Sequence, residues 1–389
     1  MGDMRSKRSR QIAVQLAVFL LPPLLLLGLE YHANGNVGSL LPDAQLYLSV
    51  ADHAIRTGHF IQTARPIAGF VVPPGVPFAL LLLRLAHFSL PMICIVHCLM
   101  MGGGCLLLYR TGRRLFGPWG ILAPAVYTLA YLRCRLYLGN IYVEHWYLFL
   151  LCVIVWLLYR EMAEGKRLGL LNLAGLAALL IRPALLPVYL AGLLCTLVFC
   201  LKNKKLPLAI FALLLPAVLL GMNCWVNYRE TGEAILLQNY SGTDVYRAFS
   251  PDAPVTREQS EAYDDPVYFD VYNDPSLTMS EKSRTLMDLA KTNVREDPLR
   301  YAGKVAARGF EIYLKCYYYF TTLAALAGGI WLSKTRKGGR SWLPLAVNLT
   351  LVLASCLGIP ELRYSMPIWP LASLHLAALA HRLSLRLRQ

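Results

Sequence analysis

The feature that most constrains this chain is a series of long apolar segments separated by short polar or basic connections. A helix needs about 17–25 mostly apolar residues to cross the hydrocarbon core of a bilayer. The segments are continuous and rich in Leu and Ala, whereas the strands of a membrane barrel alternate apolar and polar residues. The sequence therefore predicts an all-α polytopic membrane protein with about ten transmembrane helices. The expected spans are Ile12–Leu29, Met92–Tyr109, Gly117–Tyr131, Trp146–Tyr159, Leu168–Ile181, Leu185–Cys200, Leu206–Val226, Phe310–Leu332, Trp342–Leu357 and Pro367–Leu379.

The distribution of positive charge predicts the orientation in the membrane. The chain carries 38 Lys and Arg residues against 23 Asp and Glu residues. These basic residues gather in every second connection, and Lys and Arg are enriched in short cytoplasmic loops. The basic segments, counting the N-terminus before an uncleaved first helix and the C-terminal tail, alternate in phase with the expected spans. We therefore expect a multi-pass protein of a bacterial inner or plasma membrane with both termini cytoplasmic and no nucleic-acid partner.

Composition divides the chain into three parts. Residues 1–228 form a predicted N-terminal transmembrane catalytic module, in which residues 30–91 are the first outer loop. Residues 229–305 are polar and show a helical pattern only over Ser280–Glu296. We expect them to form a small extramembrane loop domain on the outer face rather than an independent catalytic domain. Residues 306–389 supply the C-terminal transmembrane helices.

The first outer loop contains a predicted amphipathic helix over Asp43–Thr57, with Pro42 before it and Gly58 after it. Its polar and apolar residues fall on opposite stripes, as in a helix that lies in the membrane interface. Asp43 projects from the apolar stripe, one turn before Tyr47. Two interpretations of Asp43 are open. It is either an anion favoured by the dipole of the first helical turn, or a carboxylate kept at an apolar surface for a function.

Three further charged residues occur at expected outer connections. Glu144 lies between two apolar spans, and Arg182 and Arg363 lie at the outer ends of later ones. Each alone fits a solvated loop charge, but acids and arginines at one membrane depth are typical of a polar cavity. An acid accepts a proton from a hydroxyl or positions a divalent cation, and arginine complements phosphate oxygens. The combination suits a lipid phosphate whose head group lies at that depth.

Several short motifs occur in order along nearly the whole chain. They are Asp43-Ala-Gln-Leu-Tyr47-Leu-Ser-Val-Ala51, Val72-Pro73-Pro74-Gly75-Val-Pro77, Leu180-Ile-Arg182-Pro183, Asn227-Tyr228-Arg-Glu-Thr-Gly232 and Arg363-Tyr364-Ser-Met-Pro367-Ile-Trp-Pro370. Together they resemble the GT-C superfamily of polyprenyl-phosphate-sugar-dependent membrane glycosyltransferases. The most similar branch includes the bacterial protein O-mannosyltransferases and the lipid A aminoarabinose transferase. Val72 stands where that family often has a lysine.

The resemblance implies a GT-C-like fold and a glycosyltransferase activity. A sugar would move from a polyprenyl-phosphate-linked donor to a hydroxyl of a lipid, glycan or protein acceptor on the non-cytoplasmic face, among membrane lipids. Asp43 would be the catalytic base or metal-positioning acid and Glu144 the second acid. A divalent cation, if the reaction uses one, would bind these two carboxylates, and no other cofactor is expected. The donor phosphate is expected at Arg182 or Arg363. The expected substrate-lining residues are Tyr47, Pro73, Pro74, His145 and Tyr364.

The main alternative is a transporter or flippase of a lipid-linked or small anionic substrate, which would use the same charges as a pathway. Against it, the sequence shows no obvious inverted repeat, and the outer charges have no counterparts at the other face. The sequence also contains no P-loop, HExxH, GxSxG or Rossmann fingerprint, which disfavours nucleotide-driven transport and the common hydrolases. A polysaccharide polymerase or ligase of another membrane fold would also use outer arginines.

Overall fold

The computed structural model describes residues 2–35, 42–60, 70–132, 140–161, 168–315, 325–331 and 343–387. Within these ranges the regular structure is helical, and β-type pairing is limited to isolated bridge residues at Val71 and Asn140. The prediction of an all-α chain is therefore confirmed.

The described helices include four stretches that are long and apolar enough to cross a membrane. They are Ser9–Ala33, Leu90–Leu132, Pro183–Lys202 and Leu206–Thr231. Shorter apolar helices accompany them at Gly75–Leu85, Val143–Tyr159, Gly169–Ile181 and Val347–Cys356. These helices indicate a membrane protein, whereas the number of ten spans and the orientation of the termini stay predictions.

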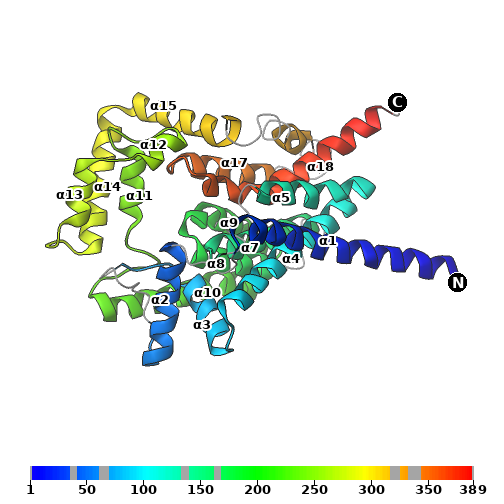
Figure 1. Cartoon of the computed structure of the whole chain (residues 1–389), viewed down its shortest axis with the longest axis horizontal. Helices are drawn as coiled ribbons and strands as arrows, with labels where there is room; N and C mark the ends of the chain where they lie inside the picture. The colour runs from blue at the N-terminus through cyan, green and yellow to red at the C-terminus, as the bar shows by residue number, and fades with distance from the viewer. Residues whose placement is uncertain are drawn as a thin grey trace.

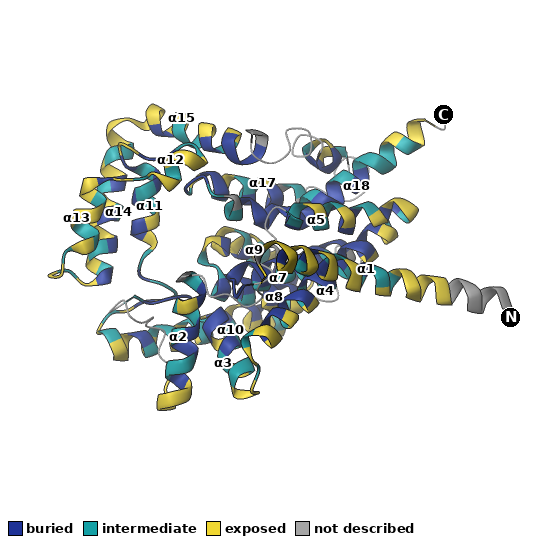
Figure 2. Cartoon of the chain, in the orientation of Figure 1, coloured by how far each residue is buried: buried dark blue, intermediate teal, exposed yellow. Residues whose placement is uncertain are grey.

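Large apolar side chains remain exposed on several helices. In Figure 2 much of α1 (Gly2–Asn34) is coloured as exposed. On α1 the side chain of Leu21 is 63% exposed. On α10 (Leu206–Thr231) that of Met222 is 62% exposed. Soluble proteins rarely leave apolar surface of this extent in water. Lipid tails would cover these helices, so their exposure is what a membrane environment predicts.

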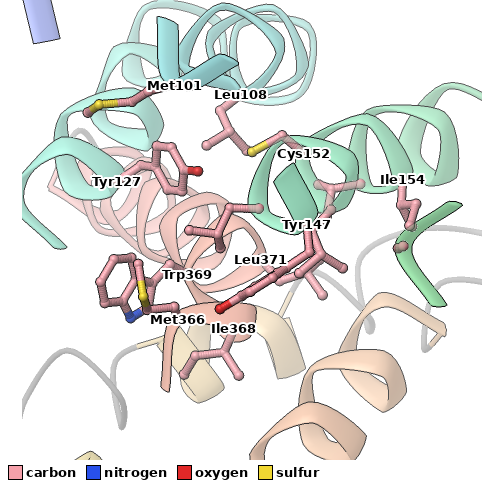
Figure 3. Packing of buried hydrophobic residues seen from close by; sticks show 14 of the residues in the cluster. Met101, Leu108, Tyr127, Tyr147, Cys152, Ile154, Met366, Ile368, Trp369 and Leu371 are labelled. Atoms are coloured by element: carbon pink, nitrogen blue, oxygen red, sulfur yellow. The ribbon is translucent and has the colours of Figure 1, made fainter. Parts of the chain in front are cut away.

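A bundle of packed helices forms the centre of the molecule. Its long helix α4 (Leu90–Phe116) packs against α1, α5 (Leu122–Leu132), α7 (Val143–Glu161) and α18 (Trp369–Arg386). Gly102 on α4 lies so close to the carbonyl oxygen of Phe19 on α1 that a larger residue would not fit. Figure 3 shows part of the core between these helices, built by Met101, Leu108, Tyr127, Tyr147, Cys152, Met366, Trp369 and Leu371.

Several expected spans match the observed helices closely. The matching helices are α8 (Leu168–Ile181), α9 (Leu186–Lys202), α10 and α17 (Leu343–Cys356). The expected span Phe310–Leu332 begins with a π-helical turn, η3 (Phe310–Lys315), and residues 325–331 are helical. The rest of that span lies outside the described residues.

Two of the basic segments expected on the cytoplasmic side, residues 110–114 and the C-terminal tail from Arg382, are helical where the structure describes them. α4 continues through Arg113 and Arg114 to Phe116, and Gly117, with φ 58°, follows its last residue. The 3-10 turn η1 (Gly117–Ile121) then joins α4 to α5. The expected C-terminal tail is likewise part of α18, which ends at Arg386. Arginine is a good helix former, so the loss of hydrophobicity marks the end of the apolar run and not the end of the helix.

The segment expected to be the first outer loop contains the predicted helix, α2 (Pro42–Thr57), which packs against α3 (Gly75–Leu85). The buried face of α2 consists of Ala44, Leu48, Val50, Ala51 and Ala54. The amphipathic pattern is therefore confirmed, and in the structure its apolar face packs against protein.

The region expected to be mostly irregular, residues 229–305, is largely helical. It forms α11 (Ser241–Phe249), α12 (Arg257–Glu261), α13 (Pro266–Asn273), α14 (Met279–Glu296) and the start of α15 (Pro298–Gly309). Only α14 was predictable from periodicity, because the other helices are short and begin at local caps such as those of Thr256 and Asp265. In Figure 1 α11–α14 lie at one end of the molecule and both termini lie toward the other.

Candidate functional site

A cavity of about 380 Å³ lies where α11 and α13 meet the ends of the apolar helices. Segments from distant parts of the sequence contribute its walls: α2, the approach to α3, the start of α7, the end of α8, α11, α13 and the segment after α17. Its charged and tyrosine lining residues are Asp43, Tyr47, Glu144, Arg182, Tyr240, Asp244, Arg247, Tyr268, Tyr272, Arg363 and Tyr364.

Asp43 and Arg363 form an ion pair across 320 positions of sequence. Asp43 lies in the first turn of α2, and Arg363 lies in the 3-10 helix η4 (Leu362–Ile368). The Nη1 atom of Arg363 donates to Oδ2 of Asp43 at 2.7 Å, and its Nε atom donates to Oε2 of Glu361 at 2.6 Å. The Asp43 side chain remains 38% exposed. The arginine therefore orients this carboxylate and leaves it accessible from the cavity.

Glu144 and Arg182 form a second, more buried ion pair. Glu144 is fully buried in the first turn of α7, and Arg182 lies between α8 and the short 3-10 turn η2 (Pro183–Leu185). Nη1 of Arg182 donates to Oε1 of Glu144 at 3.1 Å. The guanidinium carbon lies 5.0 Å from the ring centre of Tyr147 and 5.2 Å from that of Tyr364. These cation–π contacts hold Arg182 at the wall of the cavity.

A close approach of backbones sets the position of the proline-rich wall. A side chain at Gly75 would lie 2.7 Å from Cγ1 of Ile181 and 2.9 Å from the carbonyl oxygen of Leu180. Glycine therefore lets the start of α3 contact the end of α8. This contact places Pro73, two residues before Gly75, beside Arg182 in the cavity lining.

Asn239 joins the same wall to the outer helices. The backbone N–H of Val71 donates to its Oδ1 atom at 3.0 Å, and its Nδ2 atom donates to Oγ of Ser280 at 3.3 Å. The ring of Phe70 stacks on that of Tyr240, with centres 4.4 Å apart. Asn239 is therefore a buried connection between α14 and the segment that leads into α3.

The wall of the cavity formed by α11 and α13 consists of residues that the sequence pattern did not identify. They are Gln238, Tyr240, Thr243, Asp244 and Arg247 on and before α11, with Tyr268 and Tyr272 on α13. The rings of Tyr268 and Tyr272 stack with centres 5.5 Å apart, and the Arg247 guanidinium lies over Tyr263 and Tyr268. The sequence feature that could have identified this wall is the spacing of Asp244 and Arg247, which puts both side chains on one face of a short helix.

Asp244 has an unusual electrostatic environment. Its side chain is exposed toward the cavity, but protein atoms surround that cavity on several sides. This burial raises the pKa of Asp244 to about 6, against the opposing influence of Arg247, Arg363 and Arg182. The carboxyl group therefore changes its charge close to neutral pH.

The structure brings most of the residues predicted from sequence into one cavity. Asp43, Tyr47, Pro73, Glu144, Arg182, Arg363 and Tyr364 line it. Pro74 and His145 do not. Pro74 precedes the first residue of α3 as its N-cap. His145 follows Glu144 on α7 and points into the bundle, because adjacent helical residues face different sides. There it is buried and stacks on His97, with ring centres 4.5 Å apart.

The cavity is a poor match for a divalent cation. Within the part of the chain that the structure describes, no group of three or more His, Cys, Asp or Glu side chains is arranged to hold a metal ion. The two expected ligands, Asp43 and Glu144, each already contact an arginine, which a cation would have to displace. The carboxylates can instead accept a hydrogen bond from a hydroxyl, and the guanidinium groups beside them can donate hydrogen bonds to phosphate oxygens.

Comparison with known proteins adds no further assignment. No family model, no curated protein and no solved structure matches this chain.

Proposed function

We propose that this chain is a membrane glycosyltransferase that moves a sugar from a polyprenyl-phosphate donor to an acceptor hydroxyl. The observation that carries the proposal is the convergence of Asp43, Glu144, Arg182 and Arg363, from four separate segments, in one cavity. An acid to bind a hydroxyl and guanidinium groups to bind phosphate are the two requirements of this transfer. The resemblance to the GT-C superfamily supports the same chemistry.

The depth of the cavity supports a lipid-linked donor. Arg182 directly precedes Pro183–Lys202, a stretch long and apolar enough to cross a membrane. A phosphate bound at Arg182 would therefore lie at the boundary of the bilayer, with its polyprenyl chain along the apolar helices. With the cavity on the outer face, both termini would be cytoplasmic, as the basic connections predict. Their position away from α11–α14 in Figure 1 is consistent with this orientation.

The arginines would bind and stabilise the phosphate. Arg182 and Arg363 keep unused donors beyond their ion pairs, because a guanidinium carries five N–H groups. Arg247 supplies a third guanidinium, which forms no ion pair with a described residue. The phosphate gains negative charge as the bond to the sugar breaks, so that the arginines would bind the leaving group more strongly than the intact donor. Such differential binding lowers the barrier to transfer.

The acceptor hydroxyl would bind at Asp43. Arg363 contacts only its Oδ2 atom, and the other oxygen is left to accept a hydrogen bond from the hydroxyl. The acceptor oxygen would then attack the anomeric carbon from the face opposite the phosphate, so that transfer inverts the configuration. Because the cavity fits a cation poorly, the proposal uses the carboxylates directly.

Sugar transfer by purified protein in liposomes tests the proposal. Synthetic polyprenyl-phosphate sugars would be offered with a panel of lipid and glycan acceptors, and glycosylated products would be measured by mass spectrometry. Asp43→Asn should lower the transfer rate at least about 100-fold. Asp52→Asn is the matched control, since Asp52 lies on the same helix in an exposed ion pair with Arg84.

Two outcomes would contradict the proposal. Full transfer by Asp43→Asn would show that this carboxylate has no role in the reaction. Movement of the intact donor lipid across liposomes, with no sugar transferred, would identify the chain as a flippase.

A further inference from the structure

Asp244 is the acid of the cavity whose carboxylate is not held by an arginine. Asp43 is bonded to Arg363 and Glu144 to Arg182. Asp244, in contrast, forms no ion pair or hydrogen bond with a described residue, although it lines the same cavity. A carboxylate in a binding cavity without a fixed partner is free to contact a ligand there.

The fold holds Asp244 firmly in that position. It lies on α11, which packs closely against α14 because Gly242 on α11 contacts the backbone of Ser283. The N–H of Gly242 also donates to Oγ of Ser283 at 2.8 Å. Asp244 therefore projects from a rigid helix pair rather than from a loop.

The groups around Asp244 come from several elements. Arg247 lies one turn further along α11, Arg363 and Tyr364 lie on η4 with Glu361 just before it, and Arg182 lies between α8 and η2. From α13 and the approach to α11 the neighbours are Tyr268, Tyr272 and Tyr240. The buried residues of α14 are Met279, Ser283, Leu286 and Ala290, which carry no charge. Burial raises the pKa of Asp244 to about 6 despite the three arginines, so the group can both accept and release a proton near neutral pH.

We propose that Asp244 accepts the proton of the acceptor hydroxyl during transfer, while Asp43 orients that hydroxyl. This inference rests on the proposed glycosyl transfer. The acceptor oxygen forms a bond to the anomeric carbon, and the bond between that carbon and the phosphate oxygen breaks. The electron pair of the broken bond leaves with the polyprenyl phosphate, and the hydroxyl proton moves to Asp244. Asp244 then releases the proton to water through the open cavity.

The assignment predicts how the rate depends on pH. A carboxylate acts as a base only when it is ionised, so the transfer rate should fall as the pH falls through about 6, the pKa of Asp244. Asp244→Asn has nearly the same shape but accepts no proton at this position. It should lower kcat at least about 100-fold and remove the dependence on pH near 6. KM for the donor should change little, because the phosphate binds the arginines.

The experiment measures kcat and KM between about pH 5 and 8 for the wild-type protein in liposomes, Asp244→Asn, Asp244→Glu and the control Asp270→Asn. Asp270 is an exposed acid on α13 outside the cavity lining, and its variant should behave as the wild type. Asp244→Glu keeps a carboxylate and should retain both the pH dependence and a rate within about tenfold of the wild type. Thermal unfolding of each variant in detergent shows whether it is folded.

The outcomes separate this inference from the proposed function. Wild-type rate and pH dependence in Asp244→Asn would overturn the role of Asp244 and leave the proposed function intact. The role of Asp244 would also be overturned, with the proposed function intact, if Asp43→Asn removed the pH dependence of the transfer rate and Asp244→Asn did not. Loss of the pH dependence in folded Asp244→Glu would also overturn it. A wild-type protein that transfers no sugar at any pH would overturn both proposals.

Discussion

Arg308 tests how α11 and the segment that follows it are attached to the apolar bundle. It lies near the end of α15 with its side chain fully buried. Its Nε atom donates to the carbonyl oxygen of Pro254 at 3.1 Å, and Nη1 donates to that of Gly358 at 3.2 Å. Nη2 donates to the carbonyl oxygen of Ala248 at the end of α11. One guanidinium thus connects the end of α11 and Pro254 to the segment that leads into η4.

Replacing Arg308 by Met would keep most of the aliphatic packing and remove all of these hydrogen bonds. Three carbonyl groups, of Pro254, Ala248 and the partly buried Gly358, would lose their donor, and each loss costs about 1–2 kcal/mol. Removal of the buried charge recovers part of that cost. We therefore expect Arg308→Met to lower the free energy of unfolding by about 3 kcal/mol. Sugar transfer should also fall, since α11 carries Asp244 and η4 carries Arg363.

Reversible unfolding in mixed detergent micelles measures the change in stability. Arg300→Met is the matched control, because Arg300 lies on the same helix and donates to the carbonyl oxygen of Pro251 at 3.0 Å while exposed to solvent. The control should unfold as the wild type does. If Arg308→Met were as stable as the wild type, burying the guanidinium would cost as much free energy as its hydrogen bonds contribute. The argument that Arg308 stabilises this connection would then be wrong.

Two glycine substitutions test the close contacts that shape the cavity. Gly75→Ala should displace the proline-rich wall, because its methyl group would lie 2.7 Å from Cγ1 of Ile181. We expect Gly75→Ala to transfer sugar more slowly than the wild type while the amount of folded protein changes little. An unchanged transfer rate would contradict this account. In Gly242→Ala the added methyl group would overlap the carbonyl oxygen of Ser283 and push α11 away from α14. We expect this variant to have a lower melting temperature and a lower transfer rate than the wild type. Gly303→Ala, where the space is open, is the control for both, and an equal effect there would remove the packing explanation.

Periodicity and composition predicted the apolar helices well where the information is local. The boundaries of α8 agree with the expected span, and α2 follows its proline and amphipathic pattern. The same reasoning ended α4 too early, because it followed hydrophobicity while the basic residues continued the helix to Phe116. It also treated residues 229–305 as mostly irregular. Short helices that begin at single caps carry too few residues to show a period.

The candidate site was partly predictable for a related reason. A charged residue beside an apolar span is visible in sequence, and Glu144, Arg182 and Arg363 were found in this way. Asp43 was found because it projects from the apolar stripe of an amphipathic helix. In the polar outer region an acid is ordinary, and Asp244 does not differ from its neighbours until the fold surrounds it. Its pKa is raised by burial, which is a property of tertiary structure alone.

The amino-acid sequence by itself determined where the apolar helices lie and which charges lie near their ends, because these properties depend on residues that are neighbours along the chain. Tertiary structure decided the pairing of Asp43 with Arg363 and of Glu144 with Arg182, and it brought α11 and α13 over the cavity. Such contacts depend on how helices from distant parts of the chain approach one another. The approach in turn depends on close packing at positions such as Gly75 and on buried connections such as Arg308. Packing at these positions acts between segments far apart in sequence, so no local pattern records it.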